Sequence, residues 1–107
     1  MQTQQLNPAI HVGGHRRLVP QQIVRLVADR NYTLIYEASG RNLLIATTLK
    51  IIEERLRPFG FLRVTRGDVV NRSFIERVWK NGTVQLCDGT QIFSSRRRQK
   101  SVMAALF

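Results

Sequence analysis

Residues 74–93, which read FIERVWKNGTVQLCDGTQIF, decide the fold class of this chain. Three runs of β-branched, aromatic and other apolar residues are separated there by Asn81-Gly82 and Asp88-Gly89. Asn-Gly and Asp-Gly are strong short-range signals for a tight hairpin, because both supply the positive φ angles that such turns require. The stretch therefore predicts a three-stranded antiparallel meander.

The chain before this stretch predicts further strands and one internal helix. Leu49, Ile52 and Leu56 recur at helical spacing and Pro58 ends the run, which places a helix near residues 48–57. Runs rich in β-branched and apolar residues surround it, at residues 23–28, 32–38, 43–46, 59–64 and 69–70. The predicted fold is mainly β with a minor α part: elongated β-sheets, this internal helix and a short C-terminal helix over residues 99–107.

The first 17 residues differ in composition from the rest of the chain. They are rich in glutamine, contain Pro8 and the pair Gly13-Gly14, and lack a strand or helix pattern. A chain of 107 residues suits a single hydrophobic core. We therefore expect a flexible N-terminal arm over residues 1–17 and one folded domain over residues 18–107.

The charge balance indicates the kind of partner. The chain has 17 Lys and Arg against 7 Asp and Glu, a net charge of +10, and 14 of the 17 cations are Arg. The excess is concentrated in residues 55–107, which carry 11 basic and 3 acidic groups. Such a field favours a polyanion, and the planar guanidinium group grips phosphate or guanine with two hydrogen bonds.

Several other classes of protein are disfavoured. No run approaches the roughly 20 apolar residues that span a bilayer, so a membrane role is not expected. The single Cys87 cannot form an internal disulfide, which suits the cytoplasm, and its apolar surroundings predict a buried thiol. His11 and His15 lie in the expected arm, and no metal-ligand spacing or phosphate-binding glycine loop is present. We therefore expect no enzyme activity, no cofactor and no metal.

Three basic segments are candidates for nucleic-acid contact. They carry Arg30, Asn31 and Tyr32 in a short polar loop, Arg66 in a second loop, and Arg96, Arg97 and Lys100 in a run of four cations within five residues. Arginine and asparagine are base-edge readers, and dense cations bind phosphates. The alternative interpretations are plain turn chemistry with Asn31 in the left-handed conformation, an Arg66–Asp68 pair, and a solvated charge run beside a C-terminal helix.

In order and spacing, these segments resemble the LytTR-type DNA-binding domain, the output module of a class of bacterial response regulators in two-component systems. The resemblance covers roughly residues 18–106, and its pieces are residues 27–33, 48–54, 61–71, 88–89 and 95–97. It implies elongated β-sheets whose loops enter successive major grooves of double-stranded DNA. It also implies structural roles for Phe61, Val70 and Asn71.

We expect a sequence-specific bacterial transcription regulator that contacts DNA through Arg30, Asn31, Tyr32, Arg66, Arg96, Arg97 and Lys100. For Asn31, Tyr32, Arg66, Arg97 and Lys100 this expectation is what the resemblance implies. Because each groove contact is weak, homodimers on repeated half-sites are expected. The chain departs from the family where Thr65-Arg66-Gly67-Asp68 replaces a usual His-Arg-Ser and aromatic residue. Two alternatives are an RNA-binding β-domain and a protein-interaction module that has lost DNA binding, for which Asp68 is the main argument.

Overall fold

The computed structural model describes residues 8–106 and measures 42 × 36 × 23 Å along its principal axes. Within these residues, short 3-10 turns at residues 20–22, 57–59 and 72–74 accompany ten strands and two helices. The elements are β1 (Ile10–Gly13), β2 (Arg16–Leu18), β3 (Ile23–Asp29), β4 (Tyr32–Glu37), β5 (Asn42–Ile45), α1 (Leu49–Leu56), β6 (Phe61–Thr65), β7 (Asp68–Asn71), β8 (Ile75–Val78), β9 (Thr83–Leu86), β10 (Gln91–Phe93) and α2 (Arg96–Leu106).

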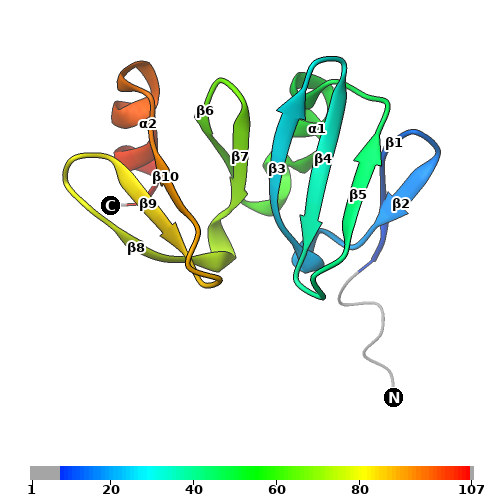
Figure 1. The fold of residues 1–107 in the computed structure, drawn as a ribbon, viewed down its shortest axis with the longest axis horizontal. Helices are drawn as coiled ribbons and strands as arrows, with labels where there is room; N and C mark the ends of the chain where they lie inside the picture. Colours follow the sequence, from blue (N-terminus) through cyan, green and yellow to red (C-terminus); the bar gives the residue numbers. More distant parts are fainter. Residues whose placement is uncertain (1–7, 107) are drawn as a thin grey trace.

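The strands form two sheets and a separate hairpin, as Figure 1 shows. The larger sheet has the order β5-β4-β3-β7-β6, with every neighbouring pair antiparallel. The smaller sheet is the meander β8-β9-β10 that the sequence predicts, with Gly82 at φ +95° and Gly89 at φ +91° in its turns. The mainly β fold with one internal and one C-terminal helix is confirmed.

Two hydrophobic cores lie on opposite faces of the larger sheet. On one face, Leu49, Ile52 and Leu56 of α1 pack against strand residues such as Leu26 and Ile35. On the other face, residues of β6 and β7 pack against the meander and α2, through Val64, Val70, Val84, Leu86, Ile92 and Val102. Side chains alternate between the faces of a strand, so β6 and β7 contribute to both cores. These two strands therefore join the part of the protein around α1 to the part that contains the meander and α2.

The three residues expected to be structural lie inside the protein. Phe61 is 4% exposed and Val70 is fully buried. Asn71 is 2% exposed, and its side-chain amide donates to the carbonyl oxygens of Pro20 and Ile23 while its Oδ1 accepts from the backbone of Ser73. Asn71 thus satisfies backbone groups that are distant from it in sequence.

The N-terminal segment departs from the sequence prediction. Residues 1–7 of the expected arm lie outside the described residues, but residues 10–18 form the β1–β2 hairpin. Val12 of this hairpin is fully buried in the core beside α1, and the Nη1 of Arg55 donates to the Val12 carbonyl at 2.9 Å. The sequence did not predict this hairpin, because a single buried valine between polar residues and glycines does not give the alternating pattern of a strand.

Two further predictions were wrong in detail. Cys87 is exposed rather than buried, because it lies in the β9–β10 turn and not within a strand. The C-terminal helix begins at Arg96 rather than Gln99, so the basic run belongs to the helix. Arginine is a good helix former, and a run of cations therefore does not mark a loop.

Two general features bear on function. Neither helix in residues 8–106 has the length and apolar character needed to cross a bilayer. The same part of the chain holds no group of three or more His, Cys, Asp or Glu arranged to bind a metal ion.

Candidate nucleic-acid interface

The three basic segments predicted from the sequence lie along one edge of the molecule. In Figure 1 the β3–β4 turn, the β6–β7 turn and the start of α2 all lie along the top edge, which runs with the longest axis. Hydrogen bonds tie the neighbours together: the Ala28 amide donates to the Gly67 carbonyl at 2.8 Å, and the Ser95 amide donates to the Val64 carbonyl at 2.9 Å. The edge is therefore held by the sheet and not by flexible connections.

The seven candidate side chains share two properties. Arg30, Asn31, Tyr32, Arg66, Arg96, Arg97 and Lys100 are all exposed. Within residues 8–106 the ion pairs involve Arg41, Arg57 and Arg63, and none of the seven. The positive charges along this edge are thus available to an external anion.

The β3–β4 turn presents Arg30 and Asn31 at its tip. Asp29 and Tyr32 form the last pair of the strands, so the turn has two residues. Arg30 takes the left-handed conformation with φ +59°, whereas the alternative interpretation placed Asn31 there. An L-residue rarely adopts this conformation because its Cβ crowds the backbone. Arg30 is therefore held in an unfavourable backbone state at the exposed tip.

The β6–β7 turn is internally hydrogen-bonded. The Thr65 hydroxyl accepts from the Gly67 amide at 3.0 Å and donates to Asp68 Oδ2 at 2.5 Å. Asp68 is half-buried and bonded to Thr65, and it forms no ion pair with Arg66. Gly67 is not in the left-handed region, so its conformational freedom is not what shapes this turn. Arg66 remains the exposed residue at the tip.

The start of α2 separates its cations by helical geometry. Residues three and four apart share a helix face, so Arg96, Arg97 and Lys100 project on one side. Arg98 is half-buried and lies on the opposite side with the buried Val102. No acidic residue lies in the first turn of this helix, where the positive end of the macrodipole already disfavours cations. An anion at this terminus relieves that repulsion.

Comparison with known proteins identifies the family. The family model of the LytTr DNA-binding domain matches residues 14–107 of this chain. This chain belongs to the LytTr DNA-binding domain family. Its fold is similar to the LytTr DNA-binding domain of a protein described as a methyl-accepting/DNA response regulator from Bacillus cereus, with a TM-score of 0.75 and 15% identity over 92% of this chain and 95% of that one. No curated protein matches the sequence.

Family membership fixes the broad activity of this LytTr domain. It is a DNA-binding domain that serves transcription regulation, DNA is its partner, and the family is not one of enzymes. Of the sequence predictions, the family and the mainly β fold are confirmed. The individual contact residues stay predictions.

Sequence reasoning missed two side chains of this LytTr domain. Lys80 is exposed in the β8–β9 turn, which lies beside α2 because Gln99 Nε2 donates to the Asn81 carbonyl at 3.3 Å. An isolated lysine next to a hairpin turn gave no signal. Arg63 was not singled out from the sequence, and its guanidinium points toward α1, where Nη1 donates to Glu53 Oε1. Strand alternation relative to Phe61 indicates that direction, because residues two apart share a face.

Proposed function

We propose that this LytTr domain is a sequence-specific transcription regulator that binds double-stranded DNA through loops placed in successive major grooves. The observation that carries the proposal is the alignment of three exposed basic segments along one edge. The edge follows the 42 Å axis, and one turn of B-DNA advances about 34 Å. The molecule is therefore long enough to reach from one major groove to the next on one face of a duplex.

The contact groups divide into two kinds. Arg66 and Asn31 lie at turn tips and have the chemistry to read guanine and adenine edges respectively. Arg96, Arg97 and Lys100 on one face of α2 suit phosphate oxygens, which fix position without reading sequence. Arg30 and Tyr32 flank Asn31 and complete the contact at the β3–β4 turn.

Family membership also supports a proposal for the biological setting. A single domain with three narrow contacts gains affinity and specificity when a second copy binds a neighbouring site. We propose homodimers on repeated half-sites and a cytoplasmic location, as the output of a two-component system.

The two alternatives are less well supported by the geometry. RNA-binding sheets stack bases on clustered aromatic side chains, but the exposed Tyr32, Phe59 and Phe93 lie in three separate elements. Asp68, the main argument for a protein-interaction module, is bonded to Thr65 within its own turn. The structure of the turn therefore accounts for Asp68 without a protein partner.

A salt titration tests the proposal. Fluorescence anisotropy should show duplex binding whose log affinity falls linearly with log salt, with a slope of about −0.9 for each phosphate contact. Arg66→Ala and Arg97→Ala should each weaken duplex binding by about fivefold or more. The matched control is Arg41→Ala, which removes the same charge from the exposed β4–β5 turn at the other end of the sheet.

Selection from a random duplex library tests specificity. Enrichment of a motif repeated at about one helical turn supports sequence-specific binding by dimers. Binding to the library without enrichment of any motif would show that the domain binds DNA without sequence specificity. Equal loss in all three variants, or a preference for single-stranded RNA, would show that the assigned edge is not the contact surface.

A further inference from the structure

Arg63 lies in β6 but does not face the proposed DNA edge. Side chains alternate along a strand, so Arg63 shares the face of Phe61, which is buried in the core beside α1. The Arg63 side chain is only 15% exposed. A charged group in such a position needs partners, because burial removes water from it.

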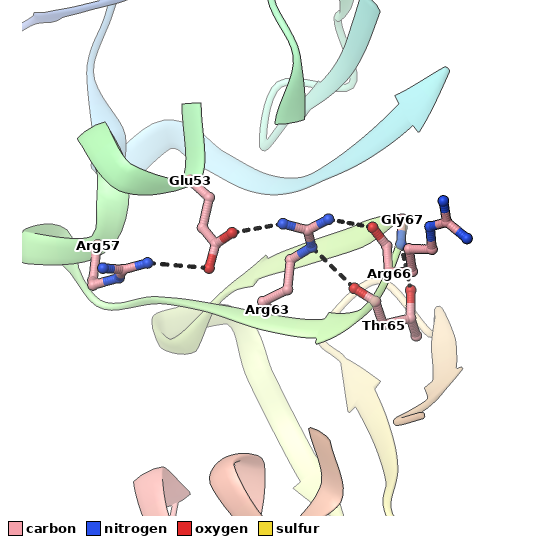
Figure 2. Close-up of polar contacts among 6 residues, drawn as sticks. All are labelled: Glu53, Arg57, Arg63, Thr65, Arg66 and Gly67. Carbon is pink, nitrogen blue, oxygen red and sulfur yellow. Dashed lines mark hydrogen bonds and ion pairs between the residues drawn. The ribbon is translucent and has the colours of Figure 1, made fainter. Parts of the chain in front are cut away.

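The guanidinium of Arg63 has three partners, as Figure 2 shows. Its Nη1 donates to Glu53 Oε1 of α1 at 2.6 Å, and its Nε donates to the Thr65 carbonyl at 3.0 Å. Its Nη2 donates to the Arg66 carbonyl. One side chain therefore links helix α1 to two consecutive backbone groups of the β6–β7 turn.

These bonds complete the hydrogen bonding of the turn. The ladder between β6 and β7 shifts register between Arg63 and Thr65, which takes the following carbonyls out of the regular pattern. The Arg63 side chain donates to the Thr65 and Arg66 carbonyls, and the Ala28 amide donates to the Gly67 carbonyl. The backbone on both sides of Arg66 is thus fixed, while Figure 2 shows the Arg66 guanidinium pointing away from Arg63.

Glu53 gives this arrangement its direction and its charge balance. Its carboxylate holds one edge of the Arg63 guanidinium, which leaves the other donors aimed at the turn. It also offsets the positive charge of Arg63, which otherwise repels Arg66. Glu53 is shared with Arg57, but that contact is 3.5 Å long and Arg57 is 65% exposed, so it is weak.

We propose that Glu53 and Arg63 are positioning residues that fix the β6–β7 turn so that Arg66 is presented to DNA. Neither residue contacts DNA. This inference rests on the proposed function, because it assigns Arg66 to the DNA contact. Lysine cannot replace Arg63, since a single ammonium lacks the planar fork that reaches three acceptors in different directions.

Charge-matched variants separate positioning from simple electrostatics. Arg63→Lys keeps the net charge and should weaken duplex binding by at least about fivefold. The loss should not exceed the loss of affinity that Arg66→Ala causes. Glu53→Gln makes the protein more positive, so general attraction predicts tighter binding, whereas positioning predicts weaker binding. The controls are Arg57→Lys, which spares the turn, and Glu54→Gln, which makes the same charge change at an exposed neighbouring residue. Neither control should weaken binding.

A double-mutant cycle tests the route through Arg66. With Arg66→Ala already present, Arg63→Lys should cause no further loss, because there is no side chain left to position. Additive losses would overturn the proposal, since they would mean that Arg63 contacts DNA itself or acts on the whole fold. The pair borders a hollow of about 230 Å³, and Arg63→Lys and Glu53→Gln each keep a polar side chain there, so folding should persist.

Amide exchange in the free protein gives an independent readout. The amides of Gly67 and Ala28 should exchange about tenfold faster in Arg63→Lys and Glu53→Gln, while the Gly82 amide in the meander should not change. Unchanged exchange at Gly67, or global unfolding of both variants, would refute the positioning role. Absence of duplex binding by the wild type would refute the proposed function alone, because this exchange measurement uses no DNA.

Discussion

Replacement of Arg30 by glycine should separate DNA affinity from fold stability. Arg30 adopts φ +59°, a conformation that costs an L-residue roughly 1–2 kcal/mol and costs glycine almost nothing. Glycine also loses about 0.5–1 kcal/mol more chain entropy on folding. The exposed guanidinium lies outside the ion pairs of residues 8–106, so its removal adds little. We expect the free energy of unfolding to stay equal or to rise by about 1 kcal/mol.

The same substitution should weaken DNA binding. Loss of one phosphate contact lowers the magnitude of the salt slope by about 0.9, and loss of a base contact costs about 1–3 kcal/mol. Urea denaturation gives the stability and anisotropy at four salt concentrations gives the slope. Arg30→Ala is the matched variant, because it removes the same guanidinium but keeps the backbone strain.

The two variants should therefore bind DNA equally weakly and differ in stability, with glycine the more stable. A loss of more than about 1 kcal/mol in Arg30→Gly would show that the backbone strain is not relieved there. Unchanged affinity and slope in both variants would remove Arg30 from the interface.

Three further substitutions test the fold. Val12→Ala should lower the free energy of unfolding by about 2 kcal/mol in urea titrations, since it leaves a cavity in the core beside α1. Asn71→Ala should cost about 2–4 kcal/mol, because two buried carbonyls lose their donor. Hydrogen bonds from Thr90 lower the pKa of Asp88 below its ordinary value. The ionised carboxylate therefore stabilises the fold at neutral pH, and this contribution is lost as the pH falls through the lowered pKa. Asp88→Ala should therefore lower Tm at pH 7, and the gap to the wild type should narrow in acid.

The turns of the meander were predictable because their signals are local. Asn81-Gly82 and Asp88-Gly89 carry the positive φ angles on their glycines, and the Asn81 and Asp88 side chains each accept from the backbone amide two residues on. The helix around Ile52 was predictable for a similar reason, because its apolar spacing is visible within one segment.

The features that sequence reasoning missed depend on distant contacts. The strand that contains Val12 is stabilised by a core that forms only when α1 is in place. The role of Arg63 depends on backbone carbonyls freed by a register shift, which no residue pattern encodes. The candidate edge was predictable as a set of basic segments, but the division of α2 into an exposed face and the half-buried Arg98 required the helix to begin at Arg96.

If the three basic segments form one continuous DNA-binding edge, amide chemical-shift mapping with a duplex should perturb all three together. We expect the largest shifts to fall together in residues 29–32, 65–68 and 95–100. The turns at residues 38–41 and 87–90, at the opposite end in Figure 1, should not shift. Shifts concentrated at those opposite turns, or confined to one of the three segments, would show that the three segments do not form one DNA-binding edge.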